Sequence, residues 1–232
     1  MKKNFFRFGF IKILPIMSGV VPFGAVVGSA ASEAGLSVTQ TMLFNVFVFA
    51  GASQLAAIDL MTKGGTIVVV VLTGLVINLR FLLYSAAISP VLSGASFWAK
   101  LSGAYFLTDQ SYAVMTAHEM HFKKTADAVQ FYFGSCVCMA ITWHLAVLAG
   151  ALFGNFAPQD WALDYAVPLS FIVLVIPTLK NRKYILVAIS SAVSGILLYR
   201  LPLNLGLIAS AIVAISLAVL LTRKSAVARV SE

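Results

Sequence analysis

Charged residues are scarce in this chain. Lys, Arg, Asp and Glu together make up 10% of its 232 residues, whereas soluble domains carry about 25%. So few charges cannot cover a water-exposed surface, and 60% of the residues are hydrophobic, with a mean hydropathy of +0.96. The composition leaves no room for a separate soluble domain. It predicts an all-α, polytopic integral membrane protein in which helices cross the lipid bilayer.

Acidic residues and cysteines are also few. Eight acidic residues face 16 basic ones, giving a net charge of +8. The basic residues fall in short clusters between apolar runs, which argues against nucleic acid as a partner. Cys136 and Cys138 are two positions apart and so lie on different helix faces. We expect them to be packing residues, with neither a disulfide nor a metal site.

Enzyme motifs are missing as well. The sequence contains no GxSxG, CxxC or paired-aspartate signature, and "HEMH" (118–121) has the wrong spacing for HExxH. An intramembrane hydrolase would need a nucleophile and a base, and no such pair is visible. We therefore predict that the protein is not an enzyme and carries no cofactor.

What the chain does contain is a series of long apolar runs, each near the roughly 20 residues that cross a bilayer. They predict eight spans, at about 13–32, 39–61, 65–90, 97–118, 128–153, 165–179, 184–200 and 203–222. The sixth span is short and contains Pro168 and Pro177. If it is broken or re-entrant, seven crossings remain. We expect a single transmembrane domain over 1–232, with a cytoplasmic basic segment at 1–12 and a cytoplasmic tail at 223–232.

The positive charges predict the orientation. Of the 16 Lys and Arg residues, Arg80 lies inside a span, and only Lys100 and Arg200 lie on the outer side if the N-terminus is inside. The other thirteen are then cytoplasmic, as the positive-inside rule requires. We expect a multi-pass protein of the cell (inner, cytoplasmic) membrane with both termini in the cytoplasm.

Five spans carry polar or helix-breaking residues at a similar depth. At 1.5 Å per residue, these residues lie about 14–18 Å below the outer loops; they are Pro22, Gly51, Arg80, Asp109 and His144. An arginine at the bilayer centre costs roughly 2.5–3.5 kcal/mol, and ionisable residues there are functional candidates by default. The alternative is a buried Arg80–Asp109 pair that only holds two helices together.

Pro22 predicts a break in the first helix. Its ring removes the bond to the Ser18 carbonyl and crowds that group, and broken helices facing a midplane site recur in transporters. The alternative is a kink packed by neighbouring helices. His144 is either a proton carrier or a hydrogen-bonded packing residue. The Gly24–Gly28 and Gly150–Gly154 spacings predict helix contact surfaces.

Four ordered motifs suggest a family. "PFGAVVG" (22–28), "FAGASQLAAI" (49–58), "NLR" (78–80) and "LTDQS" (107–111) resemble the AzlC-type permeases, the large subunits of branched-chain amino acid exporters. The resemblance implies export of valine, leucine and isoleucine, with methionine a further candidate, together with a small AzlD-type membrane subunit. The positions that match the family's motif residues are Pro22, Gly24, Gly51, Gln54, Asn78, Arg80, Thr108 and Asp109.

Two positions depart from the family pattern. The family commonly has Glu where this chain has Gln110, and often His or Tyr where it has Phe81. The first departure removes a possible proton carrier or cation ligand.

The mechanism expected from these residues is binding of an amino acid zwitterion at mid-membrane. Its carboxylate meets Arg80 or the N–H groups after Pro22, and its ammonium approaches Asp109. The apolar side chain of the substrate contacts aromatic neighbours of the site, such as Phe23, Phe49 and Phe81.

Two helper roles complete this hypothesis. Gln54 or Asn78 assists at the ammonium, and protonation of Asp109 couples export to a proton gradient, with His144 as the other proton-coupling candidate. Two alternatives stay open: a transporter or channel for another small solute, and a non-transporting membrane scaffold in which Arg80–Asp109 is a structural tie.

Overall fold

The computed structural model describes residues 4–118, 122, 124–153, 179, 181–200 and 205–230. Most of these residues are helical, with no strand among them, as predicted for an all-α chain. The chain forms two compact units, 1–174 and 175–232. The first unit contains every candidate site residue.

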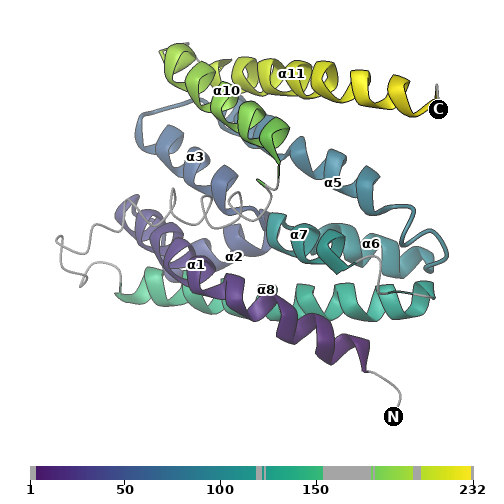
Figure 1. Ribbon diagram of the computed structural model, residues 1–232. Coiled ribbons are helices and arrows are strands. Elements are labelled where there is room, and N and C mark those ends of the chain that lie inside the picture. Colours follow the sequence, from purple (N-terminus) through teal and green to yellow (C-terminus); the bar gives the residue numbers. More distant parts are fainter. Residues whose placement is uncertain are drawn as a thin grey trace. The chain divides into compact units, whose positions relative to one another are not determined.

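Two long helices, α1 (Phe5–Glu33) and α8 (Thr125–Phe153), form the spine of the first unit (Figure 1). They pack closely because glycines face backbone on the opposite helix. Gly9 and Gly28 of α1 face the carbonyls of Phe131 and Val147, and Gly150 of α8 faces that of Ala25. No side chain fits at these points, so small residues allow the close approach.

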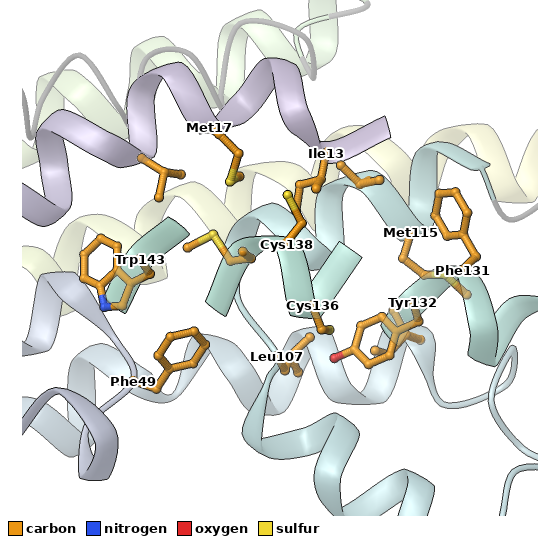
Figure 2. Packing of buried hydrophobic residues seen from close by; sticks show 14 of the residues in the cluster. Ile13, Met17, Phe49, Leu107, Met115, Phe131, Tyr132, Cys136, Cys138 and Trp143 are labelled. Atoms are coloured by element: carbon orange, nitrogen blue, oxygen red, sulfur yellow. The ribbon is translucent and has the colours of Figure 1, made fainter. Parts of the chain in front are cut away.

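The core is built around this pair. Figure 2 shows Ile13 and Met17 of α1 directed toward Cys138 and Trp143 of α8, and this cluster continues to Phe49, Leu107 and Met115 on other elements. Cys136 and Cys138 are free thiols, 1% and 2% exposed. They are packing residues, as predicted.

The next three predicted spans each contain two helical segments, and in the second of these spans the segments are joined through Leu79, which itself has helical dihedrals. They are α2 (Val38–Phe47) with α3 (Gly51–Thr62), α4 (Ile67–Asn78) with α5 (Arg80–Ile88), and α6 (Phe97–Tyr105) with α7 (Asp109–His118). The junctions lie at 48–50, 79 and 106–108. Outer boundaries agree with the predicted spans, whereas the internal breaks were not predicted.

The prediction of a broken first helix is wrong. Helix α1 is one continuous helix that contains both Pro15 and Pro22. A membrane helix tolerates proline when neighbours hold it in place, and here α8 packs against the turn after Pro22, with Ala146 and Val147 beside Gly24. The Gly24–Gly28 spacing is a helix contact surface, as predicted. So is Gly150, whereas Gly154 lies outside the described residues.

Three helical stretches of the described chain are long and apolar enough to cross a membrane: Phe5–Glu33, Ile67–Ile88 and Thr125–Phe153. In the second unit, α10 (Arg182–Leu198) packs against α11 (Leu205–Val230), and Lys183 Nζ donates to the Leu221 carbonyl at 3.0 Å. Of the predicted sixth span, 165–179, only Leu179 is described. Residues 5–12 of the predicted basic segment form the first turns of α1. The single-domain boundaries stay a prediction.

Candidate functional site

The three helix junctions meet at one cavity. Each second half-helix contributes the residues at its start: Ala50–Ala52 around the start of α3, Arg80 and Phe81 at the start of α5, and Thr108–Gln110 at the start of α7. The remaining lining is apolar, from Phe23, Phe49, Met139 and Trp143. The cavity measures about 20 Å³, which is room for a water molecule.

An ion pair borders the cavity. Arg80 Nη1 lies 3.1 Å from Asp109 Oδ2, and the two side chains are 24% and 18% exposed. Tyr84 donates its hydroxyl to the other oxygen, Oδ1, at 2.8 Å. Both carboxylate oxygens of Asp109 are therefore engaged, and the guanidinium also lies 5.1 Å from the ring centre of Phe81.

Tyr84 was missed in the sequence, although a signal was present. It lies four residues after Arg80, so both side chains project from the same face of α5. Its ring stacks on Tyr112 of α7, with centroids 4.4 Å apart. Tyr84 thus joins α5 to α7 through its hydrogen bond to Asp109 and its ring contact with Tyr112.

The motif "LTDQS" starts α7 and positions Asp109. Thr108 Oγ1 accepts from the Ser111 N–H at 3.2 Å, and Ser111 Oγ accepts from the Thr108 N–H at 2.9 Å. This reciprocal cap fixes the helix start. Asp109 becomes the first helical residue, and the 6% exposed Gln110 follows it along the cavity wall.

Gly51 is required by a close approach of aromatic rings. A Cβ at this position would lie 2.9 Å from Trp143 Cζ2 and 3.0 Å from Phe23 Cζ. Without a side chain, the first turn of α3 reaches the cavity beside the indole. The motif "FAGASQ" thus places main-chain atoms, rather than a side chain, at the wall.

A buried polar cluster supports this arrangement. Asn45 Oδ1 accepts from Trp143 Nε1 at 2.7 Å and from Gln54 Nε2 at 3.1 Å, and the two amide residues are fully buried. The bonds join α2, α3 and α8 across the 48–50 break. Gln54 was predicted in the site but lies in this supporting cluster instead. Asn45 was missed, because a lone asparagine in an apolar run carries no pattern.

Asn78 also lies away from the cavity. Its Nδ2 donates to Ser53 Oγ at 3.1 Å, and Ser53 Oγ donates to the Ala50 carbonyl at 2.9 Å. Asn78 lines a second, larger hollow of about 400 Å³ between α2, α3, α4 and α6, whose wall is mostly apolar. The two hollows share Phe49, Ala50 and Phe81.

The other predicted residues flank the cavity without lining it. Gly24 packs against α8, as described above. Pro22 does not line the cavity, although the next residue, Phe23, does. His144 Nδ1 lies 2.8 Å from the Ala140 carbonyl, and its ring stacks on Phe49 with centroids 5.4 Å apart. The structure thus brings together four of the eight positions proposed for binding: Gly51, Arg80, Thr108 and Asp109.

Comparison with known proteins identifies the family. A family model described as "AzlC protein" matches residues 15–157, a range that contains every cavity residue. The chain belongs to the AzlC family. An "Uncharacterized membrane protein" of Archaeoglobus fulgidus is 28% identical over 91% of this chain and 93% of the relative.

Two further relatives of this AzlC chain are also membrane proteins by name. The "Inner membrane protein YgaZ" of Escherichia coli K12 is 22% identical over 82% of this chain and 80% of the relative. An "Uncharacterized membrane protein" of Helicobacter pylori J99 is 25% identical over 84% and 86%. No solved structure matches.

Proposed function

We propose that this AzlC protein is a transporter, not an enzyme, and that it exports branched-chain amino acids: valine, leucine, isoleucine and, as a further candidate, methionine. The observation that carries the proposal is that two broken helices, interrupted at 48–50 and 106–108, and the irregular helical turn at Leu79 meet at one cavity that holds both an arginine and a carboxylate. Broken helices with ends at a midplane site are a recurrent design of secondary transporters.

The wall chemistry suits a zwitterion with an apolar side chain. Asp109 offers a negative charge for the ammonium, while Arg80 and the helix N-termini offer positive potential for the carboxylate. Phe23, Phe49 and Phe81, the aromatic residues expected to contact the substrate, all line the cavity. Gly51 and Thr108 shape its wall.

Transport requires this cavity to open. A volume of about 20 Å³ admits water but not leucine, so Phe49 and Trp143 must separate from the opposite wall when substrate enters. The breaks at 48–50 and 106–108 supply hinges for such a movement. Motions of this kind are typical of alternating access.

Coupling to protons follows from the ion pair. Protonation of Asp109 removes its charge, which weakens its hold on Arg80 and on a substrate ammonium at the same time. Substrate and proton then compete for one carboxylate, and a carrier that reorients only with one of them bound exchanges the two in opposite directions. His144 is the second candidate carrier, acting through its ring contact with Phe49.

The proposal includes a small AzlD-type membrane subunit as partner and a location in the cell membrane with both termini in the cytoplasm. The family membership supports the partner. The strong exposure of apolar side chains on α4 and α5, such as Leu75 and Leu82, is compatible with lipid and with a partner helix.

Reconstitution tests the function directly. Vesicles that contain the protein and its small partner are loaded with unlabelled leucine, and uptake of labelled leucine, isoleucine, valine and methionine by counterflow is measured. We expect uptake of the branched-chain substrates, and a dependence of net efflux on the proton gradient that Asp109→Asn removes. Absence of counterflow for all four would refute the function, and normal proton-coupled efflux by Asp109→Asn would refute the coupling role.

A structural tie is the competing role for the ion pair, since Asp109 is satisfied by Arg80 and Tyr84. The double variant Arg80→Asp with Asp109→Arg separates the two roles. A tie survives the exchange, so transport returns. A binding site with defined polarity does not, so we expect protein that folds but does not transport.

A further inference from the structure

The N-terminus of α3 is uncapped and borders the cavity. The first N–H groups of a helix have no acceptor within it, and no side chain caps α3 at its N-cap residue, Ala50. No described residue accepts a hydrogen bond from Gly51 or Ala52 N–H. Both residues line the cavity, so two main-chain donors and the positive end of the helix dipole meet there.

Gln110 provides an independent observation at the same cavity. Its side chain is buried, with 6% of the residue exposed, and it lines the cavity. It forms no hydrogen bond with any residue in the described part of the chain. A mostly buried polar side chain that borders a cavity and has no protein partner there indicates that water or a ligand binds at that point.

The ion pair does not satisfy these donors. Both oxygens of Asp109 are already engaged by Arg80 and Tyr84, and the start of α7 is capped by the Thr108–Ser111 pair. Among the described residues of this wall, the groups left without partners are the α3 N–H groups, the Gln110 amide and Arg80 Nε. All of them can donate to an anion.

We propose that the substrate carboxylate binds against the N-terminus of α3, with the Gln110 side-chain amide as a further donor. The ammonium then lies toward Asp109, while Arg80 holds that aspartate through Nη1 and adds positive potential to the site. Gln110 is thereby a substrate-binding residue for the carboxylate. This inference rests on the proposed function, because the ligand is an amino acid.

The kind of side chain at position 110 matters at this site. A glutamate there would donate a hydrogen bond to a carboxylate only when it is protonated. Gln110 donates without taking up a proton. Binding of the substrate carboxylate by Gln110 therefore requires no protonation step. Asp109 is then the carboxylate in the cavity wall.

A ligand series tests the assignment in the purified, lipid-reconstituted protein with its partner subunit. Binding of leucine is compared with binding of leucinol, which keeps the ammonium and side chain but lacks the carboxylate. Gln110→Met keeps the length of the side chain and removes the amide. We expect leucine binding to weaken by roughly 10- to 100-fold, as for the loss of a hydrogen bond to a charged group, with leucinol unchanged.

Gln54→Met is the matched control, because it removes a buried amide that is bonded to Asn45 and lies outside the cavity wall. Gln54→Met should change the affinity for leucine and the affinity for leucinol by the same factor. If Gln110→Met does not fold, Gln110→Asn retracts the amide by one methylene and should still weaken leucine more than leucinol.

Each outcome decides a question. Equal changes for leucine and leucinol in the position-110 variants, or none for either, would overturn the carboxylate site and leave the transport function standing. A wild-type protein that transports another solute but binds neither leucine nor leucinol would overturn both proposals.

Discussion

Replacing Gly51 with alanine tests whether the first turn of α3 must lie against the aromatic wall. The new Cβ would clash first with Trp143 Cη2, and even Cζ2 would lie only 2.9 Å away, about 0.6 Å inside the roughly 3.5 Å at which carbon atoms attract. Phe23 Cζ is nearly as close, at 3.0 Å. One of the aromatic rings or the helix turn therefore has to move.

The cost follows from how Trp143 is held. Overpacking of this kind costs about 1–3 kcal/mol. A shift of the indole also strains its 2.7 Å bond to Asn45, and leaving a buried donor unsatisfied costs about 1–3 kcal/mol. We expect Gly51→Ala to lower the free energy of unfolding by about 2–6 kcal/mol and to reduce leucine counterflow at least tenfold.

Thermal unfolding in detergent and counterflow in vesicles are measured on the same preparation. Gly74→Ala is the matched control, because its Cβ would meet only Ser53 Cβ at 4.0 Å, and it should keep wild-type stability and transport. The double variant Gly51→Ala with Trp143→Phe should lose less free energy of unfolding than the sum of the losses in the two single variants. Wild-type stability and transport in Gly51→Ala would refute the packing described for this wall.

Three further changes test other parts of the account. Gly28→Ala should lower the melting temperature by several degrees, since overpacking costs about 1–3 kcal/mol and its Cβ would meet the α8 backbone, whereas Gly195→Ala, with nothing within 4 Å, should not. Tyr84→Phe should slow transport about tenfold at equal expression, because the carboxylate loses a hydrogen bond; an unchanged rate would contradict its role. Cys136 and Cys138 should resist a thiol reagent until the protein unfolds; labelling of the folded protein would contradict their burial.

Apolar runs predicted the outer limits of the second to fourth spans well, whereas α1 begins at Phe5 instead of 13 and α11 continues to Val230 instead of 222. The spans expected at 39–61 and 97–118 coincide with the α2–α3 and α6–α7 segments, because lipid requires long apolar stretches whatever the internal geometry. Arg80 and Asp109 lie at a similar depth along their two spans, and this position predicted that they meet. Both charged side chains avoid lipid by facing protein at the same level of the bilayer.

The helix breaks were harder to predict, because the proline positions do not coincide with them. Pro22 lies in a continuous helix, whereas the junctions at 48–50, 79 and 106–108 contain no proline. Tertiary contacts position these junctions, including the bonds of Asn45 to Gln54 and Trp143 across the first of them. Only the Thr108–Ser111 cap is a local signal of the kind that can be read from sequence.

Alternating access at the cavity is the central claim, and a cysteine at position 52 tests it most directly. Ala52 lines the cavity at the uncapped end of α3. In vesicles of defined orientation, with Cys136 and Cys138 replaced by serine, we expect Ala52→Cys to react with an impermeant thiol reagent from either side of the membrane, and leucine to protect it from both. Reaction from neither side, or reaction that leucine does not slow, would contradict the claim.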